Sequence, residues 1–151
     1  MILFLDIDGV ILAGRHWKAG KRERLPPDTI GLLNEVIERT GARIVVSSVW
    51  REDRRLRGKL RRAGFKGEFH REWRTPESGR DIPGSLLIQG TCRGDEIADW
   101  LQRNPVNRYC IVDDDSDMRP EQKPFFVKTE FEEGLCRERV ERIVAILSGA
   151  Q

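Results

Sequence analysis

The sequence predicts an α/β fold in which helices cover both faces of a mainly parallel β-sheet. Three observations support this prediction. Apolar segments typical of buried strands alternate along the chain with amphipathic helical segments. Several of these strands end in polar residues, as strands do where a parallel sheet opens toward a ligand. The 151 residues are enough for one domain with its own core, without disulfide or metal staples.

The first half of the chain is predicted to contain two strands and two helices. Residues 2–7 are apolar up to a carboxylate, which is typical of a strand buried on both faces. Residues 14–27 are polar and basic with glycine and proline, and they predict a loop or flap. An aspartate after two prolines caps a helix over 28–39, which a glycine ends. A second buried strand follows at 42–48, and then a helix at 50–63 that is also closed by a glycine.

The second half of the chain continues the alternation after an uncertain segment. Residues 65–84 hold glycine, proline and charges with few apolar anchors, and no element is predicted there. Apolar residues at period 2 or in short runs predict strands, and apolar residues at helical spacing predict helices. The elements predicted in this way are strands at 85–89, 108–113 and 125–128 and helices at 94–104 and 135–147.

Composition indicates a soluble, globular, cytoplasmic protein. Hydrophobic residues make up 38% and charged residues 34%, and no apolar run approaches the roughly 20 residues that cross a membrane. The first residues lack the basic start of a secretory signal. The three cysteines are odd in number and far apart, which favours reduced thiols over disulfides or zinc. We therefore expect one monomeric domain over residues 1–151 and no membrane partner.

The net charge of +2 is distributed unevenly along the chain. Basic residues gather at 15–24 and 51–66, and acidic residues gather at 113–117 and 130–133. A basic surface beside a cluster of acidic residues would suit an anionic substrate that is bound near a cation.

Reactive polar residues follow three of the predicted strands. The carboxyl ends of parallel strands meet along one edge, so these side chains are expected to converge. Four converging carboxylates repel one another unless a divalent cation neutralises them, and oxygen ligands suit Mg²⁺. Mg²⁺ beside a carboxylate in a crevice suggests phosphoryl chemistry. The residues concerned are Asp6 and Asp8, Ser47 and Ser48, and Asp113 and Asp114.

These segments resemble the motifs of the haloacid dehalogenase (HAD) superfamily of phosphohydrolases. ILFLDIDGVI at 2–11 is similar to the first motif, IVVSS at 44–48 to the second, and YCIVDDDSD at 109–117 to the fourth. The third motif is a basic residue, usually lysine, and Arg93 stands in the corresponding place. VSSVWR, RGDEIADWL and YCIVDDDSDM together resemble the HAD domains associated with RNA-repair proteins. The resemblance spans about residues 2–147.

The resemblance implies a Rossmann-like three-layer sandwich, and it also implies catalytic roles. Asp6 would attack phosphorus and form an aspartyl-phosphate, while Asp8 would act as general acid and then as base. Gly9 would allow the turn that brings both near the phosphate. Ser47, or alternatively Ser48, would donate a hydrogen bond to a phosphate oxygen.

The resemblance also implies the cationic part of the site. Arg93 would stabilise charge on the phosphoryl group, with Lys123 and Lys128 as competing candidates for this third-motif role. Mg²⁺ would be held by Asp6, the backbone carbonyl of Asp8, Asp113 and Asp114.

The substrate is expected to be large, because only short segments separate the motifs and the enzyme is predicted to be capless or minimally capped. Trp17 in the basic flap could stack on a base, and Arg51 could contact a phosphate backbone. The favoured substrate is a nucleic-acid end carrying a 3′-phosphate, or a nucleotide. A phosphoacceptor domain of the receiver type remains an alternative, although its acid pair would follow the first strand. A non-catalytic nucleic-acid-binding module is the other.

Overall fold

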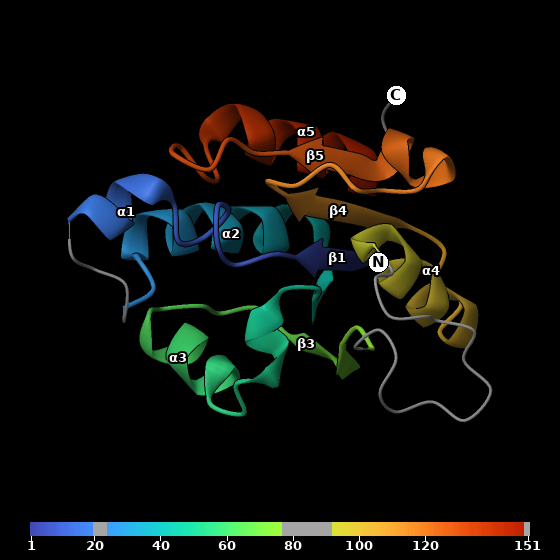
Figure 1. The fold of residues 1–151 in the computed structure, drawn as a ribbon, viewed down its shortest axis with the longest axis horizontal. Helices are drawn as coiled ribbons and strands as arrows, with labels where there is room; N and C mark the ends of the chain where they lie inside the picture. The colour runs from blue at the N-terminus through green and yellow to red at the C-terminus, as the bar shows by residue number, and fades with distance from the viewer. Residues whose placement is uncertain (20–23, 77–91, 150–151) are drawn as a thin grey trace.

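The computed structural model describes residues 1–19, 24–76 and 92–149, and a five-stranded parallel sheet forms its centre (Figure 1). Each pair of adjacent strands is parallel, in the order β3-β2-β1-β4-β5, which confirms the predicted α/β class. The strands are β1 (Ile2–Leu5), β2 (Arg43–Val46), β3 (Phe69–Arg74), β4 (Tyr109–Asp113) and β5 (Phe126–Lys128).

Helices cover both faces of this sheet. The α-helices are α1 (Gly14–Lys18), α2 (Pro27–Thr40), α3 (Leu56–Arg62), α4 (Arg93–Arg103) and α5 (Arg137–Ser148). Among the described residues, two short 3₁₀ helices are present: η1 (Val49–Glu52) lies between β2 and α3, and η2 (Pro120–Phe125) lies between β4 and β5. None of the described helices is long and apolar enough to cross a membrane.

Alternation along β1 divides the core into two layers. Leu3 and Leu5 belong to the larger apolar cluster, which includes the buried faces of α2 and α5. Ile2 and Phe4 point to the other face and pack with α4, where Phe4 meets Trp100 edge-on at a ring distance of 5.2 Å. Successive side chains of a strand point to opposite faces, so a continuously apolar strand requires cover on both sides.

Three long helices lie close to their predicted positions, at 27–40, 93–103 and 137–148. Two expectations for the other segments were wrong. The expected loop at 14–27 contains α1 at its start, and the expected single helix at 50–63 is divided into η1 and α3. The division occurs because Asp53 has extended backbone and its side chain accepts the amide of Arg55, which begins a new turn.

Strand β3 lies in the segment for which no element was predicted. Its sequence, FHREWR, buries only Trp73, because β3 is an edge strand. The strand predicted at 85–89 lies outside the described residues.

Candidate active site

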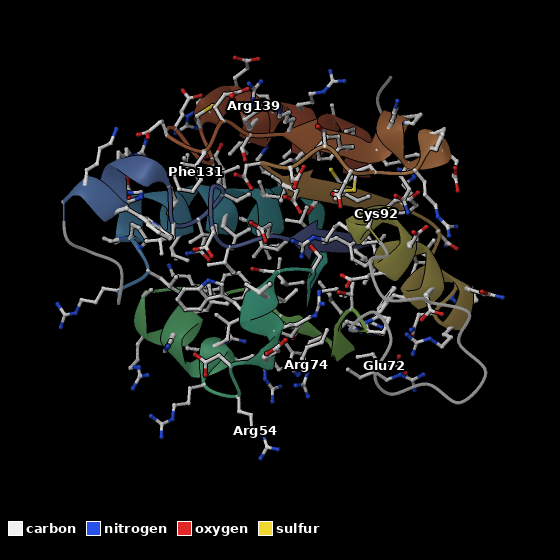
Figure 2. All side chains as sticks on the ribbon, viewed as in Figure 1. Arg54, Glu72, Arg74, Cys92, Phe131 and Arg139 are labelled. Carbon is white, nitrogen blue, oxygen red and sulfur yellow. The ribbon has the colours of Figure 1, made fainter. Side chains whose placement is uncertain are left out.

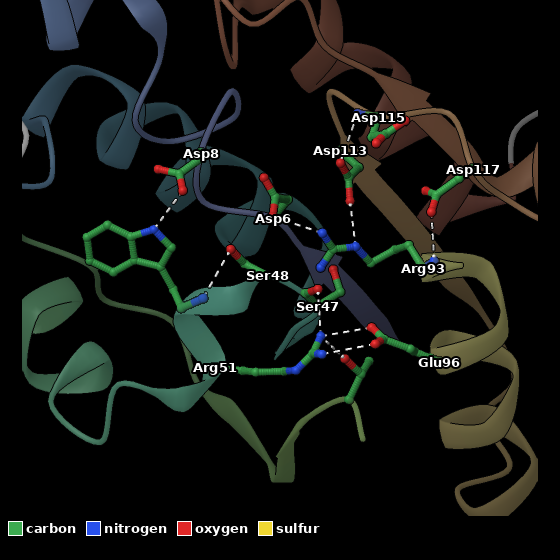
Figure 3. A network of polar contacts seen from close by, with 12 residues as sticks. Asp6, Asp8, Ser47, Ser48, Arg51, Arg93, Glu96, Asp113, Asp115 and Asp117 are labelled. Carbon is green, nitrogen blue, oxygen red and sulfur yellow. Dashed lines mark hydrogen bonds and ion pairs between the residues drawn. The ribbon is translucent and has the colours of Figure 1, made fainter. Parts of the chain in front are cut away.

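Three aspartates from β1 and β4 converge at the carboxyl edge of the sheet. Asp6 directly follows β1, Asp113 ends β4, and Asp114 comes next. One carboxylate oxygen from each lies within 4.8 Å of the others. The Asp6 amide donates to the carbonyl of Val112 at 3.1 Å, so the parallel ladder itself sets this convergence. Figure 3 shows Asp6 and Asp113 on either side of the Arg93 guanidinium.

The three aspartates of the cluster outnumber the cations paired with them, because Arg93 alone forms ion pairs with the cluster among the described residues. Burial, and then repulsion from Asp113, raise the pKa of Asp6 to about 8. Burial also raises the pKa of Asp113 to about 6, against the opposing effect of Arg93. The pKa of Asp114 is raised as well, again chiefly by burial. Oδ2 of Asp113 is buried without a hydrogen-bond partner in the described part of the chain. A divalent cation with oxygen ligands fits this donor set.

Arg93 is the cation whose ion pairs reach the aspartates. Its Nη2 lies 3.8 Å from Oδ1 of Asp6, and its Nε lies 3.4 Å from Oδ2 of Asp113. The Arg93 amide donates to Oδ2 of Asp117 at 2.9 Å, so the loop after β4 holds the start of α4 in place. Of the two competing lysines, Lys123 lies in η2, and Lys128 is the exposed register neighbour of Asp113.

Asp8 is oriented by a tryptophan that the sequence analysis did not assign to the site. Nε1 of Trp50, in η1, donates to Oδ2 of Asp8 at 2.9 Å. Oδ1 of Asp8 is buried and has no partner among the described residues. The indole therefore fixes one carboxylate oxygen and leaves the other available. Trp50 stands in the segment VSSVWR, but only the fold reveals its contact with Asp8, 42 residues away.

Gly9 makes room for a neighbouring carboxylate. Its φ of 75° lies in the left-handed region, and a Cβ atom there would overlap the carboxyl group of Asp114. The Thr129 hydroxyl donates to the Gly9 carbonyl at 2.8 Å, which holds the turn against the chain after β5. Gly9 was expected to allow the turn that brings Asp6 and Asp8 near the phosphate, and in the structure it makes that turn with a left-handed φ and packs closely against Asp114.

Both serines after β2 are buried, and their hydroxyl groups have different neighbours. The Ser48 hydroxyl hydrogen-bonds Asp6, which opposes the rise in the pKa of Asp6, and accepts the Trp50 amide at 3.4 Å. The Ser47 hydroxyl has no hydrogen-bond partner within the described ranges. Ser48 is thus the serine beside the nucleophile candidate, while the Ser47 hydroxyl is free to donate to a bound group.

Arg51 occupies a different position from the expected substrate-facing one. Its side chain is 8% exposed, and its guanidinium forms two bonds with the Glu96 carboxylate, at 2.8 and 3.0 Å (Figure 3). Nη1 also donates to the Ser47 carbonyl at 3.1 Å and to the Thr75 hydroxyl at 3.2 Å. Arg51 is engaged inside the protein because Glu96, on α4, faces it across the end of β2. By donating to the Ser47 carbonyl, the Arg51 side chain holds the backbone of the second motif in place on the side of α4.

Trp17, expected to stack on a substrate base, is a packing residue in the structure. It is partly buried in α1 against the larger apolar cluster, and its ring lies edge-on to Phe131 at 5.8 Å. Phe131 projects near α1 in Figure 2 and is 40% exposed. These contacts attach α1 to the loop that follows β5.

Comparison with known protein families identifies the family of this domain. A family model described as the HAD domain in Swiss Army Knife RNA repair proteins matches residues 2–140, a range that includes all the clustered aspartates and Arg93. No curated protein and no solved structure matches the chain.

Proposed function

Since the chain belongs to the family of HAD domains in Swiss Army Knife RNA repair proteins, we propose that it is a Mg²⁺-dependent phosphomonoesterase acting through an aspartyl-phosphate. The family supports a HAD-type phosphohydrolase that functions in RNA repair. The proposed substrate is a nucleic-acid end bearing a 3′-phosphate, with a nucleotide as the smaller alternative. The observation that carries the proposal is the convergence of Asp6, Asp113 and Asp114 next to Arg93.

Mg²⁺ would be held by Asp6, Asp113, Asp114 and the backbone carbonyl of Asp8. The bound ion would offset the repulsion between the Asp6 carboxylate and an anionic phosphoryl group. This role agrees with the raised pKa of Asp6, because positive charge nearby would keep that carboxylate ionised at neutral pH.

In the first step a carboxylate oxygen of Asp6 attacks phosphorus, and the bond between phosphorus and the leaving oxygen breaks. The leaving oxygen takes a proton from Asp8. Since Oδ2 of Asp8 accepts the indole N–H, the proton is carried by Oδ1. In the second step Asp8 takes a proton from water, which attacks the aspartyl-phosphate, releases phosphate and regenerates Asp6.

Arg93 and the serines would bind the oxygens of the transferred group. The guanidinium of Arg93, between Asp6 and Asp113, would stabilise charge on the phosphoryl oxygens. The Ser47 hydroxyl would donate to one of these oxygens, while Ser48 would keep Asp6 in place.

A phosphate-release screen with Mg²⁺ tests the proposal. It covers 3′- and 5′-phosphorylated oligonucleotides, mononucleotides, sugar phosphates and p-nitrophenyl phosphate, with a chelator control. We expect release that depends on Mg²⁺ and falls by at least about 10⁴-fold in Asp6→Asn, as when a covalent nucleophile is removed. Wild-type rates in Asp6→Asn would contradict the assignment of Asp6.

Wild type and the Asp6→Asn variant together separate the alternatives. A receiver-type domain would form phospho-Asp6 that persists for hours without turnover. A non-catalytic nucleic-acid-binding module would bind in Asp6→Asn as in wild type and release no phosphate in either. If phosphate is released but without preference for nucleic-acid ends, the chemistry stands and the choice of substrate is wrong.

A further inference from the structure

A groove with basic walls lies between the beginning of α2 and α3. Its volume is about 730 Å³, within the range of about 300–1,000 Å³ that is usual for ligand sites. We call it the basic groove, and its described lining consists of Arg24, Leu25, Pro27, Lys59, Arg62 and Ala63. Three of these residues are cations and none is an acid. Figure 2 shows several nitrogen-tipped side chains extending from the surface around α3.

The charge of the basic groove is only partly balanced. Lys59 is paired with Asp53 at 2.7 Å. Arg24 and Arg62 are exposed, and in the part of the chain that the structure describes they form no ion pair. Arg39, in contrast, is paired with both Glu35 and Glu141. Two unbalanced guanidinium groups facing one cavity would attract a ligand with more than one negative charge.

The rest of the lining is apolar. Leu25, Pro27 and Ala63 provide surfaces without polar side chains beside the cations. Phosphates alternating with flat, weakly polar rings match such a lining, and single-stranded nucleic acid has this composition. An acidic peptide would use the cations without needing this apolar wall.

The basic groove is linked to the candidate active site through one side chain. Nζ of Lys59 lies over the Trp50 ring at 5.1 Å from its centre. The same ring donates its N–H to Asp8 at 2.9 Å. A strand that has its terminal phosphate at Asp6 could therefore pass over Trp50 and reach the basic groove.

We propose that the basic groove binds the nucleotides next to the terminal phosphate of a single-stranded nucleic acid. Arg24 and Arg62 contact its backbone phosphates, and the apolar wall contacts a sugar or base. This inference rests on the proposed function for the position of the terminal phosphate. It goes further in assigning a separate site, which selects strands over mononucleotides and sugar phosphates.

Binding is measured separately from turnover. The ligand is a 5′-fluorescein-labelled, 3′-phosphorylated single-stranded RNA hexamer, followed by fluorescence anisotropy with Mg²⁺ at several salt concentrations. All proteins carry Asp6→Asn, so the ligand stays intact. The test variant is R24A/R62A, and the control is R103A/R142A, which removes the same charge. The control residues lie in α4 and α5, and Figure 1 shows α4 at the opposite end of the molecule from α3.

Each backbone phosphate that the protein no longer neutralises should reduce the slope of log K against log salt by about 0.7. For R24A/R62A we expect a slope smaller by about 1.4 and, at 0.1 M salt, binding weaker by roughly 25-fold. The control should retain the slope of the parent. Equal effects of the two pairs would overturn the proposal, as would a phosphopeptide that binds through Arg24 and Arg62 when RNA does not.

Turnover by the protein with native Asp6 distinguishes this inference from the proposed function. If R24A/R62A lowers kcat/KM for the RNA relative to that for p-nitrophenyl phosphate, both hold. If the RNA is bound through the basic groove but not dephosphorylated by wild type, the substrate in the proposed function is wrong and the groove assignment stands. If wild type dephosphorylates the RNA and R24A/R62A equals the control in binding and rate, the groove assignment is wrong.

Discussion

Two buried charged clusters lie close together at the carboxyl edge of the sheet, and their charge balance differs (Figure 3). The pair Arg51–Glu96 is balanced, with two short bonds and further donation to neighbouring oxygens. The aspartate cluster around Asp6 contains three acids, and among the described residues Arg93 is the only Lys or Arg that forms ion pairs with it, at 3.4 and 3.8 Å.

This difference distinguishes buried charges that stabilise the fold from buried charges that are available for binding or catalysis. A buried charge that has an opposite charge as its partner holds elements together, and Arg51 and Glu96 connect the segment after β2 to α4 in this way. A buried charge that is left in excess costs stability unless a ligand arrives, and such sites are where binding and catalysis are found. Arg93 and Glu96 are three residues apart on α4, so one helix serves both clusters.

Breaking the balanced pair should have the largest effect on stability. Arg51→Met leaves Glu96 buried without its partner, and we expect the free energy of unfolding to fall by about 3–5 kcal/mol. Replacing both residues, in Arg51→Met/Glu96→Leu, should restore most of the loss because no lone charge remains. Urea unfolding of the two single variants and the double variant measures this. If the double variant is as unstable as the sum of the single ones, the pair is not coupled.

Removing the cation that pairs with the unbalanced cluster should mainly affect rate. Arg93→Ala should lower kcat/KM by about 10²–10³-fold, the usual cost of losing one charged donor to a reacting group. Arg93→Lys should retain part of the rate, since it keeps the charge and loses the planar fork. Arg103→Ala, on the same helix, is the control and should be close to wild type. A wild-type rate in Arg93→Ala would transfer the third-motif role to another cation, with Lys128 as the next candidate.

The excess charge should also make stability depend on pH. The pKa of Asp6 is about 8 in the fold against an ordinary value of 3.8, so the folded chain binds this proton more tightly than the unfolded chain. The resulting stability is complete below pH of about 4 and is lost as pH rises through about 8. Without Mg²⁺ we expect Tm to fall by about 10 °C more between pH 5 and pH 8 in wild type than in Asp6→Asn. Calorimetry measures it. Added Mg²⁺ should raise Tm more at pH 8 than at pH 5. Equal increases in Tm at the two pH values would contradict the interpretation that the aspartate cluster carries excess negative charge.

The unbalanced cluster could be predicted from the sequence, and the balanced pair could not. Asp6 and Asp113 each follow an apolar strand, so a local pattern and the geometry of a parallel sheet are enough to bring them together. Arg51 and Glu96 are 45 residues apart in two helical segments, and nothing in either segment indicates the other. The sequence therefore indicated that Arg51 lies on a basic surface helix, whereas in the structure Arg51 is buried and paired with Glu96.

Local pattern also explains what was missed in the fold. β1 and β4 are covered on both faces and are apolar up to the carboxylate at their end, so both strands can be predicted from the sequence. β3 is an edge strand that buries only Trp73, and its charged residues remove the apolar pattern by which a strand is predicted. The contact between Trp50 and Asp8 likewise spans 42 residues and depends on η1 turning back toward β1.

The smallest of these effects concerns the bond from Trp50 to Asp8. Trp50→Phe removes a hydrogen bond to a carboxylate while keeping an aromatic ring, so Asp8 should lose its fixed orientation. For a small substrate with a poor leaving group, such as a nucleoside 3′-monophosphate that does not extend to the basic groove, we expect kcat/KM to fall by about 10-fold, the value of one such bond. For p-nitrophenyl phosphate the loss should be about 2-fold or less, because nitrophenolate leaves without needing a proton. The parameter kcat/KM reports the first step, in which we propose that Asp8 acts as the acid. An equal loss for both substrates would mean that Trp50 only packs against the site, and unequal losses would identify Trp50 as the residue that orients the general acid.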